Sequence, residues 1–190
     1  MKKYLPFLTL AFLISVIALS TYNLSKSQQN QQQEEESTEA ASNDFTAEFR
    51  PQKIMLPEFS LPDLYDENRE FSKKDLIGHY SVVNFFASWC TTCRAEHEVL
   101  LRLKSEGFVQ VYGVAWRDID SNTIDYLEKS GNPFMRVASD SRGLFSKIMG
   151  LTAVPETVIV DPEGNIVMRY SGNLQEFSID EIRQYLDKRR

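Results

Sequence analysis

Cysteine is scarce in this chain, with only Cys90 and Cys93 among 190 residues. No second cysteine pair exists to complete a structural zinc site, which usually takes four ligands. The chain also lacks internal repeats and an excess of positive charge. Its formal net charge of −6 argues against nucleic acid as a partner. The apolar fraction of 42% is sufficient for a buried core, and the length suits one domain with extensions.

Charge is also absent from a long segment near the N-terminus. Lys2 and Lys3 are followed by residues 4–24, which contain no charged side chain and many apolar ones. About 20 such residues can span a bilayer as a helix, and the lysines would stay in the cytoplasm. We therefore expect a membrane anchor (a signal-anchor) over residues 1–24. A cleaved signal peptide is the alternative, because residues 18–20 resemble a small-x-small cleavage site. With either segment, the rest of the chain would be exported.

The next segment, residues 25–50, is polar and of low complexity, with a run of glutamine and glutamate over residues 28–36. Such a composition buries too little apolar surface to fold. We expect a polar flexible linker over residues 25–50 and a folded domain over residues 51–190.

The cysteine pair follows an apolar run, residues 80–86, and precedes a helical pattern that starts at Arg94. Residues three apart on a helix share a face, and a helix N-terminus lowers a thiol pKa. The pattern predicts a redox-active disulfide between Cys90 and Cys93. A structural disulfide and a copper or zinc site completed by His97 are the alternatives. A c-type haem site would need histidine where Arg94 stands.

Strand and helix patterns alternate from residue 56 onward. A hairpin is expected from residues 59–61 and 69–71, ahead of a core of order β-α-β-α-β-β-α. The predicted core elements are strands at 80–86, 109–115, 157–160 and 166–170, and helices at 90–106, 121–130 (capped by Ser121), 144–149 and from 178. The tight turn at 161–165 makes the last two strands antiparallel. This order predicts an α/β fold whose mixed central sheet has helices on both faces.

These residues resemble the thioredoxin superfamily, and more narrowly the thiol:disulfide interchange proteins of the CcmG/DsbE group, which act in cytochrome c biogenesis. The resemblance rests on residues 84–97, with support from residues 131–134 and 154–157, and covers about residues 56–188. It implies a thioredoxin-like fold with an N-terminal β-hairpin extension. This chain departs from the group at Thr91, where proline is usual. The resemblance therefore does not indicate the redox potential of the cysteine pair.

The resemblance also implies roles for single residues. Cys90 would attack the substrate and Cys93 would resolve the mixed disulfide. A cis peptide bond before Pro155 would place Val154, Pro155 and Glu156 along the substrate groove. The residues expected to support the pair and tune its pKa values are Trp89, Glu96 and Asn84, the last standing where generic thioredoxins have a buried aspartate.

The function implied is that of a membrane-tethered disulfide reductase with no cofactor and no metal. Its substrate would be exported apocytochrome c or a dithiol protein of cytochrome c maturation. A membrane thiol–disulfide electron donor of the DsbD/CcdA kind would recharge it. Its location would be the bacterial inner membrane, single-pass, with the soluble domain in the periplasm. The alternatives are a copper-binding chaperone that uses Cys90, Cys93 and His97, and a general thiol oxidant or isomerase.

Overall fold

The computed structural model describes residues 48–66 and 68–189, and side chains from residue 53 onward. The predicted anchor, residues 1–24, lies outside the described residues, as does the predicted linker up to residue 47. Within the described part of the chain, no helix is long and apolar enough to cross a membrane.

A mixed six-stranded sheet forms the centre of the domain, in the order β1-β8-β7-β4-β5-β6. Strands β4, β5 and β6 are parallel, whereas β7, β8 and β1 join by antiparallel pairing. Strand β4 is buried along its whole length. The strand bounds are β1 Glu48–Met55, β4 Ser81–Phe86, β5 Gln110–Trp116, β6 Val137–Asp140, β7 Glu156–Val160 and β8 Asn165–Ser171.

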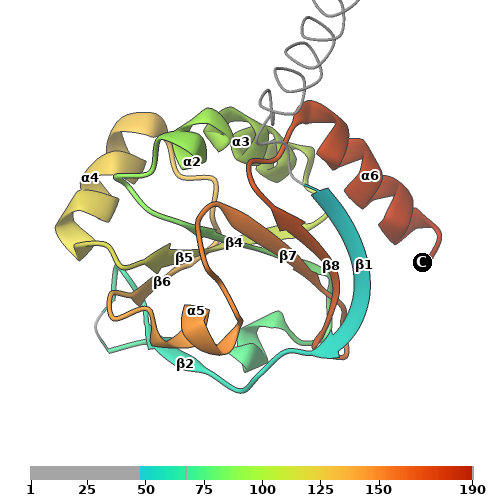
Figure 1. Cartoon of the computed structure of the whole chain (residues 1–190), viewed down its shortest axis with the longest axis horizontal. Coiled ribbons are helices and arrows are strands. Elements are labelled where there is room, and N and C mark those ends of the chain that lie inside the picture. Colours follow the sequence, from blue (N-terminus) through green and yellow to red (C-terminus); the bar gives the residue numbers. More distant parts are fainter. Residues whose placement is uncertain (1–47, 67, 190) are drawn as a thin grey trace, which may run out of the picture. The chain divides into compact units, whose positions relative to one another are not determined.

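Helices cover both faces of this sheet, as the sequence predicted (Figure 1). Helices α3 (His97–Glu106), α4 (Asp120–Ser130) and α6 (Glu176–Asp187) lie on one face. Helix α5 (Leu144–Ile148) lies on the other face, together with β2 (Ser60–Pro62). The mixed α/β thioredoxin-like fold is therefore confirmed.

Several boundaries differ from the predicted ones. Strand β1 begins at Glu48, inside the predicted linker, because its backbone pairs with β8 from Ser171 to Asn165. Strand β6 was not predicted, because a four-residue strand that ends in polar residues gives almost no periodic pattern. Helix α4 is not capped by Ser121. The Asp118 carboxylate instead accepts hydrogen bonds from the Ile119 N–H and the Thr123 hydroxyl.

The helix expected over residues 90–106 is interrupted. It forms a short α2 (Thr91–Ala95) and then α3, and the two meet at Glu96. The side chain of Glu96 is fully buried and held by polar groups of the sheet and of the segment before α6. The break thus coincides with a carboxyl group that is drawn into the interior.

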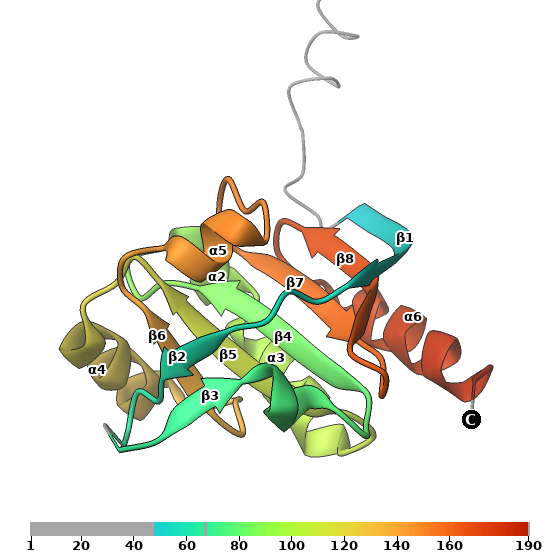
Figure 2. The same ribbon diagram turned by 90° about the horizontal axis from the view of Figure 1, so that it is seen from below.

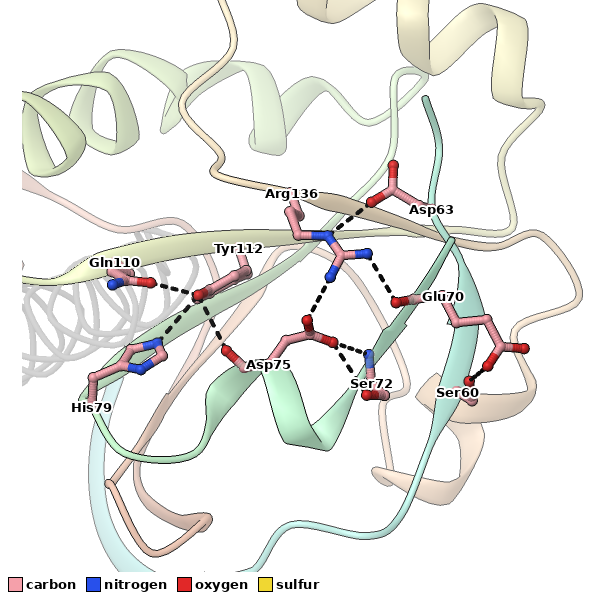
Figure 3. A network of polar contacts seen from close by, with 9 residues as sticks. All are labelled: Ser60, Asp63, Glu70, Ser72, Asp75, His79, Gln110, Tyr112 and Arg136. Carbon is pink, nitrogen blue, oxygen red and sulfur yellow. Dashed lines mark hydrogen bonds and ion pairs between the residues drawn. The ribbon is translucent and has the colours of Figure 1, made fainter. Parts of the chain in front are cut away.

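The expected N-terminal hairpin is present as β2 and β3 (Glu70–Ser72), and a 3₁₀ helix, η1 (Lys73–Leu76), follows it. The hairpin lies beside β6 (Figure 2), where the Leu64 N–H donates to the Val137 carbonyl at 2.8 Å. Figure 3 shows that Arg136 connects the two parts: its guanidinium bonds the Asp63 carboxylate (2.9 Å), the Asp75 carboxylate (2.5 Å) and the Glu70 carbonyl (2.9 Å).

The strand pairing brings distant segments to one end of the sheet. Phe86 ends β4 four residues before Cys90, and the parallel strands β5 and β6 end at the same side. Glu156 pairs with Phe85 and also with Ser171, which in turn pairs with Glu48. We call this end of the sheet the cysteine end.

We predict that Arg136→Met lowers the free energy of unfolding by about 2–3 kcal/mol. The substitution leaves Asp63 and Asp75 without their cation, and breaking a buried ion pair is strongly destabilising. Urea unfolding measures the change. The control is Lys129→Met, which removes an exposed pair with Asp125 and should cost about 0.5 kcal/mol or less. Equal losses in the two variants would show that the hairpin docks without this network.

Candidate active site

Cys90 and Cys93 form a disulfide where β4 leads into α2, as predicted. Their Cα atoms are 5.3 Å apart. Cys90 is the N-cap of α2, and its Sγ accepts a hydrogen bond from the Cys93 N–H at 3.1 Å. Both side chains are buried, Cys90 with 5% and Cys93 with 2% of its surface exposed. The backbone N–H that bonds this sulfur would equally stabilise a Cys90 thiolate.

The second neighbour of Cys90 is the segment that precedes β7. The Cys90 Sγ lies 3.6 Å from the carbonyl oxygen of Val154. The Val154–Pro155 peptide bond is cis, as the resemblance implied. A threonine hydroxyl also lies 3.3 Å from this sulfur, but it belongs to Thr92, whereas Thr91 is exposed to solvent. The hydroxyl beside the Cys90 sulfur is therefore that of Thr92 and not that of Thr91, where the family usually has proline.

Ser88 fixes the loop that carries Cys90, and the sequence analysis missed it. Its N–H and hydroxyl donate to the buried Asp118 carboxylate at 2.6 and 3.0 Å. Its carbonyl accepts two hydrogen bonds from the Arg94 guanidinium, at 3.0 and 2.7 Å. Asp118 is the second residue after β5, and residues that follow parallel strands meet at one sheet edge. The position of Asp118 after a predicted strand could therefore have indicated that it lies near the cysteine loop.

Trp89 belongs to the same loop, and its side chain faces the solvent. It is 56% exposed, and its Nε1–H donates to the Arg117 carbonyl at 3.3 Å. Its ring is 6.1 Å, centroid to centroid, from that of Trp116 at the end of β5. An exposed aromatic ring next to a reactive sulfur offers apolar surface to a docking chain.

Asn84 and Glu96, both predicted to tune the cysteine pair, contact each other. The Asn84 amide donates to the Glu96 carboxyl at 2.8 Å and to the Thr157 hydroxyl at 2.9 Å. The Leu174 N–H donates to the other Glu96 oxygen at 2.7 Å. Burial raises the pKa of Glu96 to about 8, against the two hydrogen bonds, which lower it. Glu96 is therefore largely protonated at neutral pH, and it stands three residues after Cys93, where α2 meets α3.

Glu156 does not line the groove as expected. Its side chain is buried and ion-paired with Arg169. Successive side chains of a strand point to opposite faces, and Thr157 faces Asn84 and Glu96, so Glu156 faces the other side of the sheet. Of the three predicted groove residues, Val154 lies against Cys90, with its carbonyl oxygen 3.6 Å from the sulfur.

His97 is engaged away from the sulfurs. Its Nδ1 lies 2.7 Å from the Tyr126 hydroxyl, and its Nε2 lies 3.1 and 3.0 Å from the carbonyls of Ser130 and Gly131. Over residues 48–66 and 68–189, no group of three His, Cys, Asp or Glu side chains is placed to hold a metal ion. The geometry gives the copper alternative no support.

Comparison with known proteins points to the same chemistry. The Redoxin family profile matches residues 52–186. The thiol:disulfide interchange protein DsbE of Xylella fastidiosa is 32% identical over 165 residues, which cover 87% of this chain and 77% of that protein. The DsbE of Allochromatium vinosum is 42% identical over 110 residues, which cover 58% of this chain and 61% of that protein. The match therefore spans about three fifths of that second relative.

A solved structure shares the fold. The crystal structure of a putative thiol:disulfide interchange protein DsbE from Chlorobium tepidum superimposes with a TM-score of 0.62 at 20% identity. The superposition covers 72% of this chain and 96% of that one.

We predict that Glu96→Gln flattens the pH dependence of stability between about pH 4.5 and 8. The folded protein keeps the Glu96 proton across this range and the unfolded chain releases it. The stability that Glu96 contributes is therefore complete below its unfolded pKa and is lost as pH rises towards 8. Urea midpoints at pH 5 and pH 8 measure the change. The exposed neighbour Glu98, changed to Gln, is the control and should keep the parental slope. A parental slope in Glu96→Gln would contradict the raised pKa.

Proposed function

The chain belongs to the Redoxin family, as a thiol–disulfide oxidoreductase related to the DsbE proteins, and on this premise we propose that it reduces disulfides in cytochrome c maturation. The substrate is exported apocytochrome c or the dithiol protein that presents it. The observation that carries the proposal is the Cys90–Cys93 disulfide, placed at a helix start against the Val154 carbonyl.

The reaction begins from the reduced pair. The Cys90 thiolate attacks one sulfur of the substrate disulfide, forms a mixed disulfide and expels the other sulfur as a thiolate. Cys93 then loses its proton and attacks the Cys90 sulfur, which releases the second substrate thiol. Two electrons pass to the substrate, and the enzyme is left as the Cys90–Cys93 disulfide. The released thiolates take up protons from Cys93 and from solvent.

Cys90 is the attacking residue in this scheme because it caps α2. The Cys93 N–H and the Thr92 hydroxyl both face its sulfur, and each favours the thiolate. Cys93 is more deeply buried and suits the resolving step. Val154 and Pro155 hold an extended substrate chain beside Cys90, with Trp89 on the other side.

The ionised fraction of Glu96 accepts the proton that Cys93 loses in the second step and passes it to the released substrate thiolate. A carboxyl group with a pKa near 8 exchanges protons with a thiol more readily than an ordinary glutamate, because their pKa values are close. Asn84 orients this carboxyl by its hydrogen bond. When Glu96 is ionised it opposes a thiolate nearby, because like charges disfavour each other.

The oxidised pair needs an electron donor, and we place that donor in the membrane. The predicted anchor at residues 1–24 would hold the domain at the periplasmic face of the bacterial inner membrane, within reach of a DsbD/CcdA-like partner. Strand pairing places Glu48, where the described chain begins, at the cysteine end of the sheet.

We predict that Cys93→Ala accumulates mixed disulfides with its substrate, because the resolving thiol is gone. Non-reducing gels and mass spectrometry of the bands identify the partner and the linked residue, which should be Cys90. The matched control is Cys90→Ala, which should trap little. If Cys90→Ala traps as much as Cys93→Ala, the order of attack is reversed. If the trapped protein in cells is no c-type apocytochrome and no dithiol protein of its maturation, the proposed substrate is wrong.

A further inference from the structure

Exposed charge in three segments at the cysteine end has the sign opposite to that of the whole chain. These segments are residues 87–95, 116–119 and 140–154, which contain or adjoin the cysteine loop, the end of β5 and the segment before β7. Every exposed charged residue in these segments is a cation: Arg94, Arg117, Arg142 and Lys147. The two carboxylates there, Asp118 and Asp140, are buried and accept backbone and hydroxyl hydrogen bonds. The next carboxylate along the chain, Asp120, is exposed and accepts from the Ser139 hydroxyl. In a chain of net charge −6, these three segments thus carry four exposed cations, while the exposed Asp125, which lies in one pocket with Ser88 and Trp89, is paired with Lys129.

Among these cations, Arg117 has an unusual backbone conformation. Its φ of 47° is the only positive value at a non-glycine residue in the described part of the chain. This conformation is costly for a side chain with a Cβ and tends to persist at functional sites. Two hydrogen bonds hold it here. The Arg117 N–H donates to the Asp140 carbonyl at 3.1 Å, and the Arg117 carbonyl accepts from the Trp89 indole.

The Arg117 side chain lies across an aromatic surface. Its guanidinium carbon is 5.1 Å from the centre of the Trp116 ring, and Trp116 neighbours Trp89. Gly143 leaves room for this packing, because a Cβ there would come within 2.8 Å of the Arg117 Nε and 3.1 Å of the Trp116 Nε1. Arg117 is exposed and forms no ion pair with any described carboxylate. Its charge therefore remains available to a partner.

We propose that Arg117, supported by Trp89 and Trp116, selects oxidised partner segments that carry an acidic side chain next to the reactive cysteine. This proposal rests on the proposed reductase function and names its specificity. An extended substrate chain that enters beside Val154 and reacts at Cys90 continues over Trp89. An aspartate or glutamate close to its cysteine then meets the guanidinium of Arg117. A lysine at the same place meets the like charge of Arg117, which disfavours docking.

The test uses two synthetic peptides, each with one internal disulfide, that differ only by Glu or Lys beside one cysteine. Release of peptide thiols by the reduced full-length chain in detergent gives two second-order rate constants. Each is normalised to the rate toward the uncharged hydroxyethyl disulfide. At low salt we expect a preference of about fivefold or more for the Glu peptide, as for unit charges about 4 Å apart in water. Raising the salt to about 1 M should reduce this preference towards one, since the Debye length falls to about 3 Å.

Variants assign the preference to Arg117. Arg117→Gln should remove most of it and Arg117→Lys should retain it, because only the charge separates the two. The control is Lys74→Gln, which removes an exposed cation from η1, outside the three segments of the cysteine end, and should leave the preference intact. Equal rates for the two peptides with the parental chain would overturn the proposal, as would a preference that persists in Arg117→Gln. A chain that reduces neither peptide contradicts the reductase function itself.

Discussion

The site depends on the pairing of β4 with a parallel strand on one side and an antiparallel strand on the other. Parallel pairing with β5 brings the segment after Trp116 to the end of β4, where the cysteine loop begins. Antiparallel pairing with β7 brings the start of β7, and with it the Val154–Pro155 bond, to the same end. One buried strand thus assembles three segments that are distant in sequence. Without this register, the Cys90 sulfur would have neither the Val154 carbonyl nor the Asp118-anchored loop beside it.

Polar contacts around the disulfide then decide how it reacts. Hydrogen bonds from Cys93 N–H and Thr92 hydroxyl favour a thiolate at Cys90, which makes it a competent nucleophile. We propose that the buried Glu96 acts in the opposite direction once it is ionised. No charged side chain within the described residues pairs with Glu96, which is held by the neutral Asn84 amide and the Leu174 N–H. A dithiol whose thiolate is only moderately stabilised is a better reductant than one whose reduced form is strongly stabilised.

Much of this site could be predicted from the sequence, because it depends on local patterns. The cysteine spacing after an apolar run indicated the disulfide, and the tight turn at 161–165 indicated the β7–β8 hairpin. The parts that were missed depend on contacts between distant segments. Strand β1 mixes polar and apolar residues without a clear alternation, and it forms a strand because β8 offers it an edge. Ser88 and Asp118 form their bonds across 30 residues, and neither residue type is unusual in a loop.

For Glu156, the sequence suggested a location that the fold does not give it. It stands next to Pro155 in a segment that resembles the family, so sequence proximity suggested a place in the groove. The two-residue period of the strand turns its side chain to the opposite face, where Arg169 pairs with it. Arg117 gives no local signal, since its significance comes from the left-handed backbone and the neighbouring indole rings.

The reduction potential of the Cys90–Cys93 pair tests the central claim most directly. Equilibration of the full-length chain with glutathione and dithiothreitol buffers, followed by thiol counting, measures it. We expect a value nearer that of thioredoxin, about −270 mV, than that of the oxidant DsbA, about −120 mV. A value above about −150 mV on the same scale would show an oxidant and contradict the reductase function.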